Sequence, residues 1–251
     1  MLSANSNNIG AVVLAAGRGT RLNCDDEPKV MRLIGGRPIA SFIVTTMKQV
    51  GLRADQICLV VGFKQEKVRD FFGDEVLYAE QSEQKGTAHA AFTGMMALPS
   101  DIKQVLVLNG DDSAFYRPDT LKNFIYKHCE SRAILSLLTV ETKSNTGKIV
   151  RHSNGSVEII EKEYLTEEQK KITEISTGTF MLERAWFEKI FPTMPPLRKL
   201  GEYGLPTALA IARVTDEKYQ VIKLSDPSEW HGINTIDELN SANDKKLKSN
   251  I

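Results

Sequence analysis

An α/β fold with a mostly parallel sheet, covered by helices on both faces, is predicted by three features of the sequence. Short apolar runs alternate along the chain with longer amphipathic segments, as strand–helix crossover units require. The composition is globular, with 41% hydrophobic and 25% charged residues. A chain of 251 residues is also long enough to bury a large core.

The first half of the chain carries the alternation. The expected strands are Ile9–Ala15, Gln56–Val61, Val76–Ala79, Val105–Leu108 and Ala133–Val140. The expected helices are Ile39–Val50, Gln65–Phe71, Thr87–Ala97 and Pro118–Cys129. Pro118 and Asp119 favour a helix start, because a first turn lacks partners for its amide donors and its dipole attracts negative charge.

The second half is expected to be richer in β structure and to cover the open edge of the sheet. The turn signal Ser153-Asn154-Gly155 predicts a hairpin between Lys148–Arg151 and Ser156–Glu161. The remaining expected elements are a long strand over Ile172–Leu182, a helix from Glu183 that stops at Met194-Pro195-Pro196, a helix at Leu205–Val214, a strand at Tyr219–Leu224 and a final helix from Thr235. The lysine-rich tail after Asn243 is expected to fray in solvent.

Charge, hydropathy and cysteine usage argue against a nucleic-acid-binding, membrane-spanning or secreted protein. The chain has 32 Lys+Arg and 32 Asp+Glu residues, which argues against a broad basic surface for nucleic acid. No apolar run has the length of a membrane span. A secretory signal begins with a basic region, but this sequence has no Lys or Arg before Arg18. Cys24, Cys58 and Cys129 form no CxxC pair, so we expect reduced thiols and no zinc site. These features predict a cytoplasmic protein with neither nucleic-acid nor membrane partners.

A glycine-rich loop follows the first expected strand. It reads Leu14-Ala-Ala-Gly17-Arg-Gly19-Thr-Arg21-Leu22 and is followed by Pro28-Lys29. Without side-chain bulk, such a loop can point successive backbone N–H groups at an anion, and Arg18, Arg21 and Lys29 add positive charge. Leu22 replaces the third glycine of a dinucleotide fingerprint, and the P-loop pattern is absent. The loop therefore suits a triphosphate held by amides and cations, although a tight strand–turn–helix with surface cations would use the same residues.

A second candidate site lies at the end of the apolar strand that runs into Asp111 and Asp112. Ligands of an open parallel sheet bind beyond the carboxyl ends of its strands, so a metal that serves phosphate would lie at Asp111. Mg²⁺ prefers oxygen ligands of this kind. A pair of aspartates that caps a turn is the alternative interpretation.

Together these motifs resemble the signature of nucleotidyltransferases that act on sugar-1-phosphates, most closely the uridyltransferase domain of bifunctional N-acetylglucosamine-1-phosphate uridyltransferases. The resemblance runs from Ile9 to Leu239 and includes Glu80-Gln-Ser-Glu-Gln-Lys-Gly-Thr87-Ala-His-Ala, Leu108-Asn-Gly-Asp111, Glu161, Thr166–Gly178, Gly201-Glu-Tyr and Gly232-Ile-Asn234. It implies a Rossmann-like nucleotide-diphospho-sugar transferase fold with a β-rich sugar-binding subregion. Residues 1–251 are expected to form a single domain, with a nucleotide-binding half over 9–140 and a sugar-binding half over 141–239, and without the family's C-terminal β-helix acyltransferase domain.

The resemblance also implies an activity and the residues that carry it. The expected reaction is Mg²⁺-dependent transfer of a nucleotidyl group from UTP to a sugar-1-phosphate, with N-acetylglucosamine-1-phosphate as acceptor and pyrophosphate as second product. The expected catalytic residues are Arg21, Lys29 and Asp111, and Asp111 and Asn234 are the expected metal ligands. The expected nucleotide-binding residues are Leu14, Ala15, Ala16, Gly17, Gly19, Thr20, Lys29, Gln81, Gly86 and Thr87, and the expected sugar-binding residues are Gly147, Glu161, Ser176 and Asn234.

Several points leave alternatives open. The Gln81 amide can pair with uracil, but in the flipped orientation it can pair with cytosine. The family's Gly-Tyr-Gly before the first pocket strand is shortened here to Thr146-Gly147-Lys148. Ser176 replaces a family Asn, Asn109 replaces a family Tyr, and all three departures bear on the sugar. Asp112 is outside the family's ligand positions and is expected to be an outer or loop-capping residue. The same chemistry with another acceptor or nucleotide, such as a polyol phosphate with CTP, and a non-catalytic regulatory protein that binds nucleotide sugars both remain as alternatives.

Overall fold

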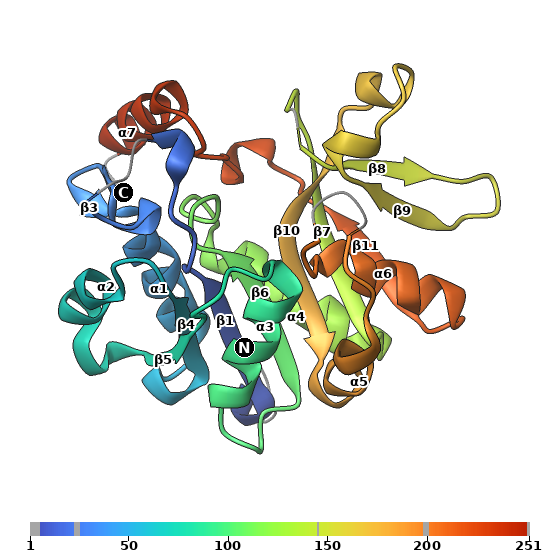
Figure 1. The fold of residues 1–251 in the computed structure, drawn as a ribbon, viewed down its shortest axis with the longest axis horizontal. Helices are drawn as coiled ribbons and strands as arrows, with labels where there is room; N and C mark the ends of the chain where they lie inside the picture. The colour runs from blue at the N-terminus through green and yellow to red at the C-terminus, as the bar shows by residue number, and fades with distance from the viewer. Residues whose placement is uncertain (1–5, 23–25, 145, 198–200, 250–251) are drawn as a thin grey trace.

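The computed structural model describes residues 6–22, 26–144, 146–197 and 201–249. Its centre is a mostly parallel sheet with the strand order β11-β7-β10-β6-β1-β4-β5 (Figure 1). These strands are β1 (Ile9–Leu14), β4 (Ile57–Val61), β5 (Leu77–Glu80), β6 (Gln104–Asn109), β7 (Leu135–Glu141), β10 (Glu174–Glu183) and β11 (Tyr219–Lys223). The α/β fold predicted from the sequence is confirmed.

The strands at the centre of the sheet are nearly continuous apolar runs. Every residue of β4 is buried, and β1, which pairs in parallel with both β4 and β6, is buried along almost its whole length. Apolar runs without alternation are typical of parallel strands that are covered on both faces. The parallel strands direct their carboxyl ends to one edge of the sheet, where the candidate site described below is found.

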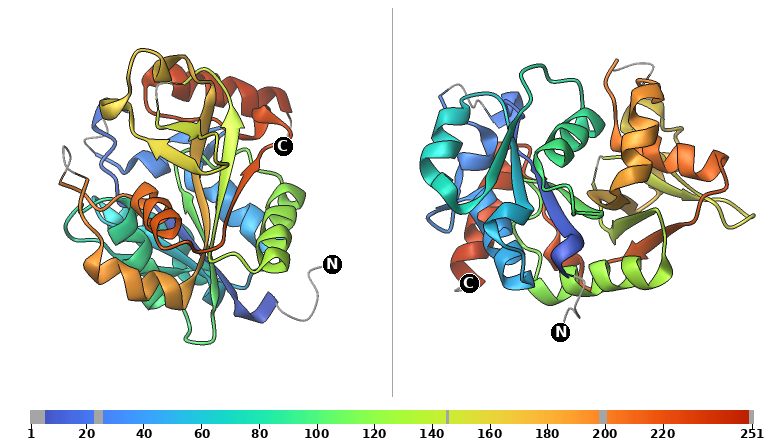
Figure 2. Two further views of the ribbon diagram at one scale, coloured as in Figure 1. Left: turned by 90° about the vertical axis from the view of Figure 1, so that its right-hand side faces the viewer. Right: turned by 90° about the horizontal axis from the view of Figure 1, so that it is seen from below.

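Helices cover both faces of the sheet, as predicted. One face packs against α1 (Ile39–Val50), α2 (Gln65–Phe72) and α4 (Pro118–Ser131), and the other packs against α3 (Thr87–Ala97), α5 (Arg184–Ile190) and α6 (Leu205–Val214). The right-hand view of Figure 2 shows the sheet between these two layers. Pro118 occupies the first turn of α4, where its missing N–H group costs no hydrogen bond.

The second half of the chain covers the otherwise open edge of the sheet, as expected, and it does so by adding strands to the sheet itself. β10 lies between β6 and β7 and is antiparallel to both, and β11 lies parallel to β7. The backbone groups along the free side of β6 are therefore satisfied by another strand of the same sheet. The predicted hairpin is present as β8 (Lys148–Arg151) and β9 (Val157–Ile160), and β8 is attached to β10 (Figure 1).

A separate apolar cluster joins the two ends of the chain. It packs the C-terminal helix α7 (Ile236–Ser249) and the segment before it against the loop after β1 and the short β2–β3 hairpin (Leu33–Ile34 and Arg37–Pro38). The buried members of the cluster are Leu22, Ile34, Ile39, Phe42, Ala114, Ile233, Leu239 and Ala242. Residues from the beginning and the end of the sequence therefore lie side by side.

The expectation that the tail after Asn243 frays in solvent is wrong as far as the structure describes it. The tail continues α7 to Ser249, and Lys246 is only 8% exposed. Its ammonium lies 4.1 Å from the ring centroid of Phe42 and 4.4 Å from that of Phe115. A lysine can cover aromatic rings with its aliphatic stem and its charge together, which a composition-based argument does not detect.

Within the described ranges, no helix combines the length and the apolar character that crossing a lipid bilayer would require. Cys58 is buried and Cys129 is exposed, and both are free thiols. Burial raises the pKa of the Cys58 thiol to about 12. Cys24 lies outside the described residues.

Candidate active site

A cavity of about 230 Å³ opens beyond the carboxyl end of β1. It is lined by Leu14, Ala15, Ala16, Gly17, Lys29, Val30, Gln81, Gln84, Gly86, Thr87, Ala90, Asp111 and Glu202. Most of the residues expected to bind nucleotide are therefore brought together, whereas Gly19 and Thr20 do not line this cavity. Val30 and Ala90 were not expected, because an apolar residue in a sequence gives no sign of whether it faces a core or a cavity.

The glycine-rich loop is held open at the mouth of the cavity. Ala15 continues the β ladder, because its N–H donates to Val60 O at 2.8 Å. Beyond it, Gln84 Nε2 donates to Ala16 O at 2.9 Å, which fixes the start of the loop from the opposite wall. Gly17 is exposed, and a Cβ atom there would meet nothing within 4 Å. Its backbone is therefore accessible to a ligand in the cavity.

Gly86 is required by its backbone conformation and by a close neighbour. Its φ is +100°, and a Cβ atom there would lie 2.6 Å from Tyr203 O. The two segments are joined by hydrogen bonds from Ala88 N to Tyr203 O at 2.7 Å and from Tyr203 N to Lys85 O at 2.8 Å. This pairing brings Glu202 into the cavity wall. Gln84 and Glu202 were not assigned a role from the sequence, although both lie within motifs that carry the resemblance.

Four polar side chains from distant parts of the sequence converge beside the cavity. Lys29 Nζ forms an ion pair with Asp111 and donates to Asn234 Oδ1 at 3.0 Å. Arg21 Nη2 donates to the same oxygen at 3.0 Å. Lys29 is only 8% exposed, so its charge depends on Asp111 for compensation. The residues expected to be catalytic are thus in direct contact with the residues expected to bind metal.

Local packing explains why these side chains meet. Lys29 begins a short 3₁₀ turn, η3 (Lys29–Met31), whose Val30 and Met31 are buried in the main core. Arg21 and Asn234 are brought together by the apolar residues next to them in the sequence. Leu22, next to Arg21, and Ile233, next to Asn234, are buried in the same cluster that joins the chain ends.

The start of α7 fixes the backbone at Asn234. Glu238 Oε2 accepts from Asn234 N at 2.6 Å and from Thr235 N at 3.0 Å, while Thr235 Oγ1 accepts from Glu238 N at 3.2 Å. This is a reciprocal capping box, which satisfies amide donors at a helix start. Asn234 was expected near a helix N-cap, and the structure places it there.

The donor set fits a divalent cation that takes few protein ligands. An Asp111 carboxylate oxygen and the Asn234 amide oxygen both contact one positively charged group, the Lys29 ammonium. Their oxygens therefore converge on a point that already holds positive charge. Among the residues that the structure describes, no group of three or more His, Cys, Asp or Glu side chains forms a metal site. Mg²⁺ usually takes one or two oxygen ligands from the protein and its remaining ligands from substrate and water, and the two oxygens here fit that pattern.

Asp112 stabilises its own loop. Its carboxylate accepts from Asn109 Nδ2 at 3.0 Å and from Ser113 Oγ at 3.3 Å. Burial, reinforced by the neighbouring Asp111 charge, raises the pKa of Asp112 well above its usual range. These contacts match the loop-capping expectation. Asn109 also lies so close to Gly178 that any Cβ atom at Gly178 would collide with the Asn109 amide.

Three of the residues expected to bind sugar lie together beside β8 and β10. Ser176 N donates to Gly147 O at 3.3 Å, and a Cβ atom at Gly147 would lie 3.3 Å from Glu161 Oε2. Burial raises the pKa of Glu161, with a smaller contribution from the Glu163 charge. Across the described ranges, the structure gives the Glu161 carboxylate no hydrogen-bond donor. Asn234, the fourth expected member, lies instead with Lys29 and Arg21.

The family model described as nucleotidyl transferase matches residues 10–249. The chain belongs to the nucleotidyl transferase family.

Curated relatives agree with this assignment. The bifunctional protein GlmU of Symbiobacterium thermophilum is 37% identical over 222 residues, which cover 86% of this chain and 46% of that protein. The bifunctional protein GlmU of Geotalea uraniireducens is 34% identical over 241 residues, which cover 94% of this chain and 52% of that protein. This nucleotidyl transferase therefore spans about half the length of the curated relatives that it matches.

Solved structures share the fold of this nucleotidyl transferase. A putative glucose-1-phosphate thymidylyltransferase from Bacillus anthracis, in complex with a sucrose, superposes with a TM-score of 0.77 at 18% identity and covers 95% of each chain. A UDP-glucose pyrophosphorylase complexed with UDP-glucose has a TM-score of 0.76 at 19% identity, covering 96% of this chain and 98% of the other. The fold class implied by the sequence resemblance is therefore confirmed.

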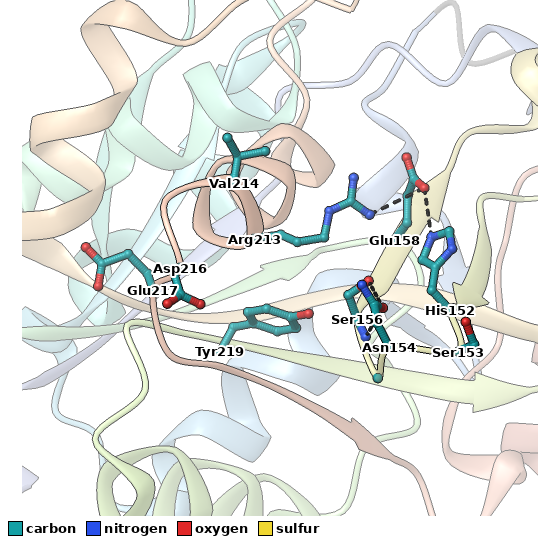
Figure 3. Close-up of a pocket in the computed structure, with 11 residues that line it drawn as sticks. His152, Ser153, Asn154, Ser156, Glu158, Arg213, Val214, Asp216, Glu217 and Tyr219 are labelled. Atoms are coloured by element: carbon teal, nitrogen blue, oxygen red, sulfur yellow. Dashed lines mark hydrogen bonds and ion pairs between the residues drawn. The ribbon is translucent and has the colours of Figure 1, made fainter.

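A larger cavity of this nucleotidyl transferase, about 850 Å³, lies between the tip of the β8–β9 hairpin and the end of α6. Glu158 lies between His152 and Arg213 (Figure 3). Its Oε2 is 3.2 Å from His152 Nε2 and 3.4 Å from Arg213 Nη1. None of the expected site residues lines this cavity. Its volume alone does not make it the candidate site, because its lining carries the acidic residues Glu158, Asp216 and Glu217 against Arg213, which does not suit a polyanionic ligand.

Proposed function

We propose that this chain transfers a nucleotidyl group from UTP to a sugar-1-phosphate, with N-acetylglucosamine-1-phosphate as the acceptor, and releases pyrophosphate. The reaction joins an acceptor phosphate oxygen to the α-phosphorus of the triphosphate. The bond from that phosphorus to the bridging oxygen of the β-phosphate breaks, and its electron pair leaves with pyrophosphate. The attacking group is already an anion, so the protein needs no nucleophile of its own.

The observation that carries this proposal is the convergence of Lys29, Arg21, Asp111 and Asn234 beside a cavity walled by the glycine-rich loop. Two polyanionic reactants repel each other and must be held in line. A site with two cationic side chains, accessible backbone amides and two oxygen ligands supplies the required positioning and charge neutralisation.

Each cation has a distinct task in the proposed reaction. Lys29 lies inside the cavity wall and is only 8% exposed, so its ammonium interacts with phosphate in a partly dehydrated environment. We assign it to the α-phosphate, where charge develops. Arg21 is exposed and donates to Asn234 Oδ1, and we assign it, with the amides of Gly17 and Gly19, to the β- and γ-phosphates.

We further propose Mg²⁺ as the cofactor, held by Asp111 and Asn234. When bound there, Mg²⁺ neutralises phosphate oxygens and orients them for in-line displacement. The protein's own part is to keep the two oxygen ligands in place. The capping box at α7 holds the backbone at Asn234, and the hydrogen bond from Gly110 N to Leu14 O at 2.9 Å holds the backbone next to Asp111.

The proposed sugar site rests on Glu161, Gly147 and Ser176. A half-buried carboxylate without donors of its own regains hydrogen bonds when a sugar hydroxyl donates to it. Gly147 leaves the approach to this carboxylate open, because a side chain there would press against it. Ser176 Oγ accepts from Gly178 N at 3.2 Å and keeps its own proton for an acceptor atom.

A second candidate is the same transfer to a different acceptor phosphate. It is supported by the three positions at which the sequence departs from its family. Asn109 donates to Asp112, and Ser176 is shorter than the family's asparagine. The Thr146 hydroxyl is buried, and no described residue or its backbone bonds to it. An acceptor with a group that can reach this hydroxyl would satisfy it.

A matrix of nucleoside triphosphates and acceptor phosphates, followed by pyrophosphate release with Mg²⁺ present, tests both candidates. UTP with N-acetylglucosamine-1-phosphate is expected to give the highest kcat/KM. A higher value with another acceptor would establish the second candidate. Tight nucleotide-sugar binding by calorimetry, with no pyrophosphate from any pair, would contradict the enzymatic proposal and favour a regulatory binding protein.

A further inference from the structure

We propose that His89 is a positioning residue that holds the Gln81 side-chain amide in one orientation, so that the amide carbonyl faces the nucleobase and selects uracil over cytosine. This inference deepens the proposed function and rests on it for the identity of the ligand. The sequence leaves the orientation of the Gln81 amide open, because an amide has a donor end and an acceptor end. The contacts around Gln81 remove that ambiguity.

Gln81 is held firmly in the cavity wall. It directly follows β5, it is only 5% exposed, and its backbone N–H donates to Val61 O at 2.8 Å. Its side-chain nitrogen has two neighbours within hydrogen-bond distance. Nε2 lies 3.2 Å from Gly86 O and 2.8 Å from His89 Nδ1.

The Gly86 contact decides which end of the amide lies there. A backbone carbonyl can only accept, so the group facing it must be the NH₂ and not the oxygen. The second NH₂ proton then points to His89 Nδ1, which accepts it when the imidazole is neutral and carries its proton on Nε2. Burial lowers the pKa of His89, and the nearby Lys85 charge lowers it further, which favours the neutral ring.

The imidazole is itself fixed in place. His89 lies in the first turn of α3, and its ring packs against Phe191, with 6.2 Å between ring centroids. Phe191 in turn stacks on Phe92 at 4.4 Å and belongs to the turn η8 (Phe191–Thr193). The acceptor nitrogen therefore has a defined direction, which a freely rotating side chain would not provide.

The carbonyl oxygen of Gln81 is the end left for a ligand. In the part of the chain that the structure describes, every hydrogen bond of this side chain uses Nε2, and Gln81 lines the 230 Å³ cavity. Uracil presents an N3–H donor to such an oxygen. Cytosine presents an unprotonated N3 acceptor, and two acceptors facing each other leave a buried polar group unsatisfied.

The test compares kcat/KM for UTP and CTP in wild type, His89→Leu and His89→Asn. Leucine removes the acceptor, so the amide turns more freely and the preference for UTP over CTP is expected to fall about tenfold. Asparagine offers a carbonyl oxygen near the position of Nδ1, and is expected to restore most of the preference. His152→Leu, on the β8–β9 hairpin, is the matched control and should keep the wild-type ratio.

Three results would overturn the inference: a folded His89→Leu enzyme with the wild-type ratio, a His89→Asn enzyme no better than His89→Leu, or a wild type that prefers CTP. Calorimetric titration of UTP and CTP gives the ratio of their dissociation constants without turnover. Absence of pyrophosphate from the wild type would therefore defeat the proposed function, while the binding ratio still decides the role of His89.

Discussion

At the scale of single residues, Lys29 is the side chain on which the proposed chemistry depends most directly. Its ammonium contacts both Asp111 and Asn234 and is nearly excluded from solvent. Lys29→Ala is expected to lower kcat about 10²–10³-fold, the usual effect of removing one preorganised charge donor from an enzyme site. Pyrophosphate release with UTP and the acceptor phosphate measures this change.

Lys122→Ala is the matched control, because Lys122 is a surface lysine of α4 paired with Asp119 at 3.8 Å. It should retain wild-type turnover. Circular dichroism is expected to show the same folded spectrum for both variants, since Val30 and Met31 still anchor the turn that carries position 29. Unchanged turnover in Lys29→Ala would remove this residue from the mechanism.

Asp111 gives the residue-scale test of the metal proposal. Asp111→Ala removes one of the two proposed oxygen ligands, and Mg²⁺-dependent activity is expected to disappear. An Mg²⁺ titration of pyrophosphate release measures the effect. Asp119→Ala, whose side chain is 98% exposed on α4, should keep the wild-type titration curve. A normal Mg²⁺ response in Asp111→Ala would place the metal elsewhere.

Much of the candidate site could be predicted at this scale, because the residue types themselves indicate what they can bind. Glycines leave backbone amides accessible, Lys and Arg attract phosphate, and Asp can bind a metal ion. What could not be predicted was their pairing. The ion pair between Lys29 and Asp111 depends on how two distant loops pack, and the orientation of the Gln81 amide depends on His89 and Gly86. Neither contact leaves a periodic or compositional pattern in the sequence.

At the scale of elements, the N-terminus of α7 positions the proposed metal ligand. Glu238→Ala removes the acceptor of two backbone donors, Asn234 N and Thr235 N. We expect a loss of about 1 kcal/mol in the free energy of unfolding, as for other helix caps. We also expect a higher Mg²⁺ requirement, because the Asn234 backbone is no longer fixed. Urea unfolding and an Mg²⁺ titration measure the two effects.

Glu238→Gln is the matched control, since glutamine can also complete a capping box. It should stay close to wild type in both measurements. If Glu238→Ala lost stability but kept the wild-type Mg²⁺ requirement, the cap would be structural only. That outcome would separate the helix start from the site.

The elements themselves were largely predictable, but their order in the sheet was not. Apolar runs located β1, β4 and β6, and Pro118 marked the start of α4. The insertion of β10 between β6 and β7 is a long-range pairing, so local periodicity cannot show it. The packing of the end of α7 could not be predicted for a similar reason. Lys246 holds this end through contacts with Phe42 and Phe115, which are distant in the sequence.

At the scale of the whole molecule, His128 links three elements through a fully buried ring. It lies on α4 and is 1% exposed. Its Nδ1 is 2.8 Å from Ser136 Oγ on β7, and its Nε2 is 2.8 Å from Gln104 Oε1 on β6. Burial lowers the pKa of His128 from 6.5 to about 4. The folded protein therefore keeps this imidazole neutral in a pH range where the unfolded chain protonates it.

The sign of the resulting pH dependence follows directly. As the pH falls below 6.5, His128 becomes protonated in the unfolded state but stays neutral in the folded state until about pH 4. Proton binding therefore stabilises the unfolded state, and the free energy of unfolding falls. The loss over that window is about 3 kcal/mol, because each unit of pKa difference corresponds to about 1.4 kcal/mol. His128→Gln should show a shallower decline in urea unfolding between these two pH values. His152→Gln, a surface control, should follow wild type, and an equally steep decline in His128→Gln would assign the acid sensitivity to other groups.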